Sequence, residues 1–484
     1  NGCGTINAGR MTLTTGKPQL NADGSLAGYQ VERGTVRIEG GGLNGDARHD
    51  TEYVDVLARA VDINAGVWAR QGLNVVAGRN RISADGKTVT ALATDGKAPE
   101  LAIDMGQMGG MYSGQIRMIG TEAGVGVRNQ GGHIQAAKTL TVSSEGKLTW
   151  QSGSQDAVTQ AGGDIRLAAR DTLEHHGKLH GGGTVSVESR EGEIKQSGTL
   201  AAAGDVALRA KRGISSSGHL LAGSDADSTL TREADLTLTS QGTLRASGSL
   251  LSKKDVKISG KRVDLSQSTL AARRASIDAG AEGVALQQAR VDAGELAVST
   301  AGDITARQAQ VGAGRWDIEA ASLSAQGGVW SQTAGGESRF ALTGQLDNTG
   351  GSMEARQLAL TAGSLANTDG RLVALDNAAQ RWEVQGLLDN RSGALGSNGN
   401  LTLSAGTLNN QDGTLQSQSA LQVRAETDIN NAGGRLLAGD AMTLDAAGRI
   451  DNVSGRIDST QLALSAEQFN NTGGELVSQQ DLTL

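Results

Sequence analysis

The sequence predicts an all-β fold: a parallel β-helix (β-solenoid) of about 20–21 residues per coil, with extra-helical loops or hairpins in the N-terminal part. Three observations predict it: the choice of apolar residues, a repeat of about 20 residues, and alternating apolar positions within each repeat. Glycine contributes 70 of the 484 residues, whereas the chain has two Pro, two Phe, five Trp and three Tyr. Short aliphatic side chains with glycine suit a narrow, layered interior, and the absence of a Gly-X-Y period excludes collagen.

The clearest repeat runs from about residue 346 to the end of the sequence. The pattern Asn-x-x-Gly-x-(Leu/Ile/Met) occurs seven times at intervals of 19 to 23 residues, and a hydrophobic residue stands two places before each Asn. A unit of this length cannot bury its own apolar face, so the units must stack on one another. The repeated positions are Asn348, Asn367, Asn390, Asn410, Asn431, Asn452 and Asn471, with Gly351, Gly370, Gly393, Gly413, Gly434, Gly455 and Gly474.

Each repeat also contains two apolar residues separated by one residue, such as Leu401 and Leu403. This alternation is typical of a strand with one buried face. The pair can be followed backwards through the chain, for example to Val206 and Leu208, at steps that are mostly 19 to 21 residues. The longest step contains the polar stretch Ser224–Ser228, which we expect to be a loop inserted into one coil.

Such strands can stack either as a meander of antiparallel hairpins or as successive coils of a parallel β-helix. Nearly constant spacing favours the β-helix, because aligned coils place Leu on Leu and Asn on Asn. The repeated Asn and Gly residues would then form a structural ladder at a turn. We expect them to supply the left-handed backbone conformation that a sharp corner needs. Their regular recurrence is explained by the turn, without a ligand-binding role.

Residues 1–135 lack a clean 20-residue period, although they contain strand-like segments such as 35–38 and 115–119. The longer excursions at 41–50 and 84–99 predict loops or hairpins added to a β-helix core. We therefore expect three segments: 1–135, a β-helix core with added loops or hairpins; 136–340, irregular coils; and 341–484, regular repeats.

Charge and hydropathy exclude several classes of function. The formal net charge is −8 with both signs interspersed, so no basic stripe for nucleic acid is present. No run of 18 apolar residues predicts a transmembrane helix. Cys3 is the single cysteine and cannot form an intrachain disulfide. The chain starts without Met and stops within an alternating run, so we expect a fragment of a longer protein.

Three N-terminal segments, Asn1–Gly16, Asp55–Trp68 and Gly109–Val127, resemble the secretion domain of two-partner secretion exoproteins. The units after residue 340 resemble filamentous haemagglutinin repeats. The family also includes haemolysins and the toxin-carrying proteins of contact-dependent growth inhibition. Its Asn-Pro-containing secretion motifs lie upstream of the segment matching Asn1–Gly16. Growth-inhibition members often have a second Cys just before the one matching Cys3.

The resemblance implies a right-handed parallel β-helix exported by an outer-membrane β-barrel transporter of the two-partner type. It implies secretion to, or display on, the surface of a Gram-negative cell, in association with the outer membrane. It further implies a rigid shaft that presents a distal toxin or adhesin module, with a target-cell receptor bound by the distal region. Alternatives are a haemolysin of the same secretion class, an autotransporter passenger, or a carbohydrate-active β-helix enzyme.

Sequence motifs for chemistry are weak. Gly40–Gly45 fits the letters of a dinucleotide fingerprint, but no apolar-periodic helix follows, so we expect no cofactor and no small-molecule substrate. His175, His176 and His180 are weak candidates for metal ligands, since zinc would need their side chains to converge. A solvated corner is the simpler interpretation of these histidines.

A polysaccharide-cleaving β-helix would need clustered carboxylates and aromatic platforms. The acidic residues are scattered, and Trp150, Trp316, Trp330 and Trp382 are far apart in the sequence. Trp316 and Trp382 occupy the repeat position that Leu or Val fills elsewhere, so we expect both in the interior. The sequence therefore predicts a protein that is not an enzyme.

Overall fold

The computed structural model describes residues 5, 7–44, 50–93, 95–151 and 158–483. These residues form strands and turns and contain no helix, so no described helix is long and apolar enough to cross a membrane. Cys3 and parts of segments 1–16 and 41–50 lie outside the described residues. The chain divides into two compact units, Asn1–Lys254 and Asp255–Leu484.

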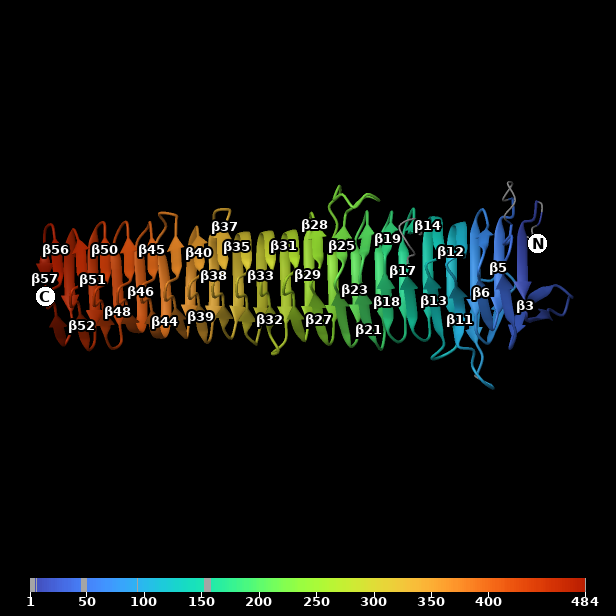
Figure 1. The fold of residues 1–484 in the computed structure, drawn as a ribbon, viewed down its shortest axis with the longest axis horizontal. Helices are drawn as coiled ribbons and strands as arrows, with labels where there is room; N and C mark the ends of the chain where they lie inside the picture. Colours follow the sequence, from blue (N-terminus) through green and yellow to red (C-terminus); the bar gives the residue numbers. More distant parts are fainter. Residues whose placement is uncertain (1–4, 6, 45–49, 94, 152–157, 484) are drawn as a thin grey trace. The chain divides into compact units, whose positions relative to one another are not determined.

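The N-terminal unit is a parallel β-solenoid in which each coil contributes three short strands. One coil contains β17 (Ile165–Ala169), β18 (Leu173–His176) and β19 (Lys178–Gly181), and each strand pairs in parallel with its equivalent one coil later. The coils follow one another in chain order (Figure 1). The first face comprises β1 (Arg10–Thr14), β5 (Tyr53–Ala58), β8 (Gly72–Ala77), β12 (Gly110–Gly120), β14 (His133–Ser144), β17, β20 (Val185–Ser189), β23 (Val206–Ala210) and β26 (Leu236–Ser240).

The second and third faces of the N-terminal unit are built in the same way. The second comprises β4 (Thr35–Ile38), β6 (Ala60–Ile63), β11 (Leu101–Met105), β13 (Gly126–Gln130), β15 (Leu148–Gln151), β18, β21 (Glu193–Gln196), β24 (Gly213–Ser216) and β27 (Thr243–Ala246). The third comprises β7 (Gly66–Trp68), the first parts of β12 and β14, β16 (Thr159–Ala161), β19, β22 (Thr199–Ala202), β25 (His219–Ala222) and β28 (Ser249–Ser252).

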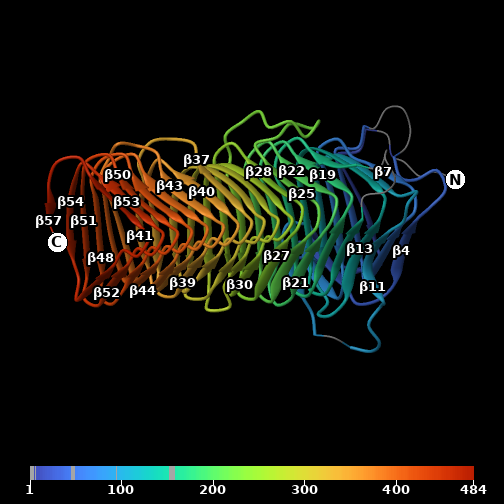
Figure 2. The same ribbon diagram turned by 60° about the vertical axis from the view of Figure 1, so that its left-hand side comes forward.

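The predicted register is confirmed, because equivalent residues of successive repeats are strand partners. Val185 pairs with Val206, and Val206 pairs with Leu236 across the longest step. That step contains the predicted loop: Ser224–Ser228 leaves the coil between β25 and β26, and Ser224 bridges to Leu230. The loop is the green segment that stands off the coils (Figure 2).

Extra-helical hairpins are present in the N-terminal unit; the β9–β10 hairpin overlaps the expected excursion at 84–99, whereas the β2–β3 hairpin lies outside both expected segments. Four strands form a separate antiparallel sheet in the order β10-β9-β3-β2, outside the coils of the N-terminal unit. They are β2 (Lys17–Leu20), β3 (Leu26–Val31), β9 (Asn80–Ser83) and β10 (Val89–Ala91). We call this sheet the clasp.

The C-terminal unit is a second parallel β-solenoid. Its coils are exemplified by β41 (Gln357–Ala362), β42 (Ser364–Ala366) and β43 (Arg371–Ala374), which pair with equivalent strands 22 or 23 residues later. The face used below comprises the first parts of β31 (Thr269–Ala279), β33 (Arg290–Thr300) and β35 (Gln310–Ala320), then β37 (Val329–Gln332), β40 (Ser352–Ala355), β43, β45 (Ala394–Ser397), β47 (Thr414–Ser417), β50 (Arg435–Ala438), β53 (Arg456–Ser459) and β56 (Glu475–Ser478).

The repeated Asn residues lie at one interior corner of the C-terminal unit. Six of them, Asn348 to Asn452, are buried, and Asn471 is half-buried. The Nδ2 atom of Asn390 donates to Oδ1 of Asn410 at 2.7 Å, and the same contact at 2.6 or 2.7 Å joins every consecutive pair of the seven. The buried amides thereby satisfy one another along the stack.

The expectation that Asn and Gly supply the left-handed conformation is wrong. The residue with positive φ stands two places after each Asn, for example Asp412 at 56° after Asn410. The turn closes when the N–H of Gly413 donates to the carbonyl of Asn410 at 3.0 Å, which places Asp412 at the position where a type II turn has positive φ. The other residues at this position are Gly350, Asp369, Ser392, Gly433, Ser454 and Gly473.

The repeated Gly is required by close packing between coils. A Cβ atom at Gly413 would lie 2.1 Å from the carbonyl oxygen of Asn390 in the preceding coil. The five other Gly residues at equivalent positions from Gly370 to Gly474 would each place a Cβ within 2.3 Å of the preceding Asn carbonyl. Gly is therefore fixed by the approach of the neighbouring backbone rather than by its own φ angle.

Candidate functional site

The clasp covers an apolar stripe on the outside of the first coils. Leu57 on β5 and Val76 on β8 alternate with inward-facing core residues, so they point away from the coil interior. Val31 and Ile82 of the clasp pack on them, and all four side chains are at most 1% exposed. Tyr29 and Val89 complete this second hydrophobic cluster.

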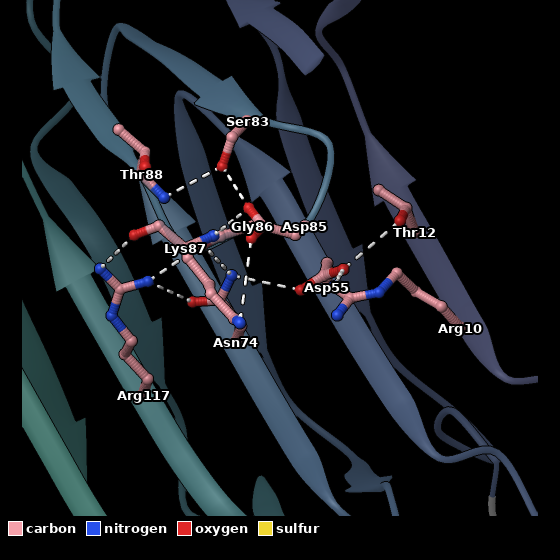
Figure 3. Close-up of polar contacts among 10 residues, drawn as sticks. All are labelled: Arg10, Thr12, Asp55, Asn74, Ser83, Asp85, Gly86, Lys87, Thr88 and Arg117. Carbon is pink, nitrogen blue, oxygen red and sulfur yellow. Dashed lines mark hydrogen bonds and ion pairs between the residues drawn. The ribbon is translucent and has the colours of Figure 1, made fainter. Parts of the chain in front are cut away.

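A column of polar side chains runs beside this cluster. Thr12, Asp55, Asn74 and Arg117 occupy equivalent positions on β1, β5, β8 and β12. The Asp55 carboxylate is almost completely buried and accepts hydrogen bonds from Arg10 Nη1, from Thr12 Oγ1 at 3.5 Å and from Asn74 Nδ2 at 3.2 Å (Figure 3). The Arg10 guanidinium also lies 5.0 Å from the ring centroid of Tyr53. Opposite charge and hydrogen bonds thus compensate the burial of this carboxylate.

The turn between β9 and β10 rests on the column. The carbonyl oxygen of Gly86 accepts from Arg117 Nη1 at 3.1 Å and from Asn74 Nδ2 at 3.3 Å (Figure 3). Gly86 has φ of 70°, and a Cβ there would lie 3.0 Å from both Asn74 Nδ2 and Asp55 Oδ1. Glycine is therefore needed for the conformation and for the close approach.

Side chains within the turn hold its shape. Asp85 Oδ1 accepts from the Ser83 hydroxyl and, at 3.1 Å, from the backbone N–H of Lys87. The hydrogen bond from Ser83 lowers the pKa of Asp85 below its ordinary value, and burial lowers the pKa of Arg117. The hydroxyls of Thr12 and Ser83 donate to the carboxylates of Asp55 and Asp85, which also accept from Arg10, Asn74 and the Lys87 N–H. This geometry suits fastening of the clasp to the coils.

The three candidate metal ligands lie apart, and the expected solvated corner is wrong for His175 and His180, which are buried. His175 and His176 are neighbours on β18, so their side chains point to opposite sides of the strand. His175 lies in the interior at 0% exposure, whereas His176 faces outward and contacts Ser197 Oγ through Nδ1 at 2.7 Å. His180 on β19 contacts the carbonyl oxygen of Ser224 through Nε2 at 3.2 Å. Among the described residues, no three His, Cys, Asp or Glu side chains are placed to hold a metal ion.

Trp316 and Trp382 lie in the interior, as the repeat phase predicts, and each is 0% exposed. Trp150 and Trp330 are buried as well. Trp316 stacks on Phe340 with ring centroids 5.8 Å apart, so its faces are occupied by protein. None of these four indoles is an exposed platform for a sugar.

Sequence reasoning missed two features of the N-terminal unit. The polar column carries no motif, because its members come from four separate coils. An outward aromatic stack was also missed: the rings of Trp68 and Tyr112 are 5.2 Å apart and nearly parallel, and His133 stacks next at 5.5 Å. Gly66 lies beneath the ring of Trp68, and Gly110 lies beneath the ring of Tyr112. The spacing Gly-x-aromatic was therefore the signal in the sequence that could have indicated this stack.

Together, two parallel solenoids and a clasped first region define a repeat-built β-solenoid. Residues 1–150 match the TPS secretion domain. The haemagglutinin repeat matches at 153–191, 190–248, 229–350, 333–381, 375–452 and 421–484. The chain belongs to the haemagglutinin-repeat family and begins with a TPS secretion domain, which indicates a secreted protein associated with the outer membrane of Gram-negative bacteria.

Curated relatives carry the name CdiA. The chain is 31% identical to a Toxin CdiA of Yersinia pestis over 98% of its own length and 14% of the relative's length. It is 32% identical to a 16S rRNA endonuclease CdiA of Enterobacter cloacae, over 98% of the chain and 13% of that protein. A Toxin CdiA of Escherichia coli is 44% identical over 34% of the chain and 5% of its own length. The chain thus spans about one seventh of the length of the first two relatives. No solved structure matches it.

Proposed function

We propose that this chain is the N-terminal part of a large secreted filament that acts in contact-dependent growth inhibition, as a shaft for a distal toxin or adhesin module. One observation carries the proposal: a single chain holds a secretion domain followed by haemagglutinin repeats and aligns over 98% of its length with a Toxin CdiA. The nuclease named in other relatives would belong to the distal module.

The proposal assigns different work to the different segments. Residues 1–135 would be recognised by an outer-membrane β-barrel transporter of the two-partner type. Residues 136–340 and 341–484 would form the irregular and the regular part of the shaft. A receptor on the target cell would be bound by a region beyond this chain. Parallel coils, each hydrogen-bonded to its neighbours, support a mechanical role because the stack resists bending and extension.

A co-culture experiment tests the proposal. Cells that make the full-length protein and its transporter are mixed with target cells, either in contact or across a filter. We expect target growth to fall only in contact, and we expect deletion of residues 1–150 to remove the protein from the cell surface. Arg166→Ala changes an exposed side chain on β17, outside the deleted residues. This variant serves as the control and should leave surface display unchanged. Unimpaired target growth beside cells that display the protein would contradict the proposal.

A further inference from the structure

An asparagine–glycine pair, Asn398 and Gly399, lies in the short segment between β45 and β46 (Leu401–Asn409). Of the three Asn–Gly pairs in the sequence, this one lies wholly within the described residues. Asn398 is exposed, and its Nδ2 atom donates to the Leu375 carbonyl oxygen of the preceding coil at 2.6 Å. The Asn398 side chain thereby ties this segment to the coil before it.

The Gly399 nitrogen is not held by a hydrogen bond. In the described part of the chain its N–H has no acceptor, and glycine has no side chain to shield it. Asn400, the next asparagine, differs in both respects, because the N–H that follows it belongs to Leu401 and donates to the Ala420 carbonyl oxygen at 2.9 Å. A hydrogen-bonded amide must open before it can lose its proton. The two exposed asparagines should therefore differ in reactivity.

We propose that Asn398 is a site of spontaneous deamidation. The Gly399 nitrogen attacks Cγ of Asn398, the bond from Cγ to Nδ2 breaks, and the proton of the attacking nitrogen leaves with Nδ2 as ammonia. The product is a five-membered succinimide ring. Water then opens the ring at either carbonyl and leaves aspartate or isoaspartate, and no group is oxidised or reduced. A hollow of about 200 Å³, lined by Asn398 with Gln416 and Gln418, is large enough to hold that water.

Either product removes the tie to the preceding coil. An aspartate at position 398 has no N–H to give to the Leu375 carbonyl oxygen, so two acceptors would face each other where a 2.6 Å hydrogen bond now stands. Isoaspartate also lengthens the main chain by one methylene group. Space is short here, because a Cβ atom at Gly399 would lie 2.2 Å from the Ala378 carbonyl oxygen. We therefore expect the pairing of β43 with β45 to loosen in the modified chain.

The asparagines of the ladder are protected from the same reaction. Asn390 and Asn410 are buried, and the N–H that follows each of them already donates to a side-chain oxygen, from Arg391 to Asp389 and from Gln411 to Asn409, both at 3.3 Å. Loss of ammonia into water is irreversible, so the change at position 398 accumulates with the age of the molecule. One coil interface of the C-terminal unit weakens with time, while the ladder remains intact.

Incubation of the purified 484-residue chain at mildly alkaline pH tests the site, with peptide mass spectrometry and enzymatic methylation of isoaspartate as readouts. We expect conversion at Asn398 to be about tenfold faster than at Asn400, the difference that one amide hydrogen bond makes. Asn398→Gln, whose longer side chain closes the ring poorly, should abolish modification at this position. Asn400→Gln is the matched control and should leave conversion at Asn398 unchanged.

Hydrogen exchange measures the expected loosening. The β43 and β45 amides should exchange faster in aged chain than in fresh chain, and Asn398→Asp should reproduce this difference without ageing. The aged and fresh forms of Asn398→Gln should exchange alike. Equal conversion at Asn398 and Asn400, or conversion at Asn398 only in chain unfolded by urea, would overturn the proposed site. Unchanged exchange in fully converted chain would overturn the proposed loosening.

Discussion

The imidazole of His175 lies in the interior of the N-terminal unit, where its neighbours form no hydrogen bond with it. Its strand partners are Trp150 and Gln196, and in the described part of the chain neither ring nitrogen has a hydrogen-bond partner. Burial, with a smaller contribution from His176, lowers the pKa of His175 to about 4 from an ordinary 6.5. The neutral imidazole is thus tolerated, while the protonated form is excluded by desolvation.

This burial predicts a pH-dependent loss of local stability. Between pH 6.5 and about 4 the unfolded chain binds a proton at His175 that the folded chain does not, so stability falls as the pH falls through this window. The full effect is about 3 kcal/mol and is reached below pH 4. Hydrogen exchange of the β18 and β21 amides at pH 7 and pH 5 measures it. In His175→Leu, the difference in opening free energy between the two pH values should shrink.

His176→Gln is the matched control for that experiment, because His176 faces solvent on the same strand. The variant should keep most of the pH dependence of the wild-type chain, because His176 makes only the smaller contribution to the lowered pKa of His175. A His175→Leu variant with an unchanged pH dependence would show that other groups titrate in this window and that His175 does not govern it.

The Asn ladder differs between its end and its middle. Asn348 begins it, since the equivalent corner one coil earlier is occupied by Ala325, and the Oδ1 atom of Asn348 has no partner in the described chain. Asn410 lies in the middle and is joined to Asn390 and Asn431. A change in the middle breaks two amide–amide hydrogen bonds, whereas a change at the end breaks one.

We therefore expect Asn410→Ala to destabilise the C-terminal unit more than Asn348→Ala. The middle substitution leaves a buried acceptor on Asn431 and removes a partner from Asn390, at a cost of roughly 2–3 kcal/mol. The end substitution costs about 1 kcal/mol, because it also removes the orphan Oδ1 of Asn348. Urea denaturation of the two variants beside wild type compares them. Equal midpoints would mean that the amide ladder contributes little beyond the backbone pairing.

Arg117 fastens the turn of the clasp to the coils. Arg117→Ala removes one of the two side-chain donors to the Gly86 carbonyl, the other being Asn74, so the turn 83–88 should open more often while the coils below remain paired. Limited proteolysis at this turn should accelerate several-fold, and exchange of the β9 amides should increase. Arg166→Ala, on the same face beyond the clasp and paired with half-buried Glu188, should leave both unchanged. Equal cleavage rates in the two variants would assign the clasp's attachment to its apolar cluster alone.

The position and register of the strands could be predicted from the sequence, whereas the conformation of the corners and the presence of the clasp could not. Inward pairs such as Val206 and Leu208 recur with the coil period, because every coil buries the same face, and register follows from that period. Corner conformation depends on the φ of a neighbour such as Asp412 and on the approach of another coil, which no local pattern encodes. The polar column joins residues separated by 12 to 45 positions and becomes visible only once the coils are stacked.

Each of the two compact units carries a continuous core and its own strand pairing. In a stacked repeat, stability is approximately the sum of the coil terms and the interfaces between neighbouring coils, so folding does not require contacts between distant parts of the chain. The C-terminal unit includes both the Asn ladder and the coils before it, in which Leu265, Leu286 and Ala306 occupy the equivalent corner. This composition makes the unit a candidate for independent folding.

We expect residues 255–484 alone to show a β-strand circular dichroism spectrum and cooperative unfolding in urea. Residues 255–420, which end before β48 (Leu421–Ala425), keep the same type of coil but fewer of them, so their m-value and stability should both be lower. The exposed strand edges at each cut favour association, so the measurement belongs at low protein concentration with sedimentation as a check. A disordered spectrum for 255–484, beside a folded spectrum for the 484-residue chain, would show that this unit needs the preceding coils as a template and that folding must proceed from the N-terminal side.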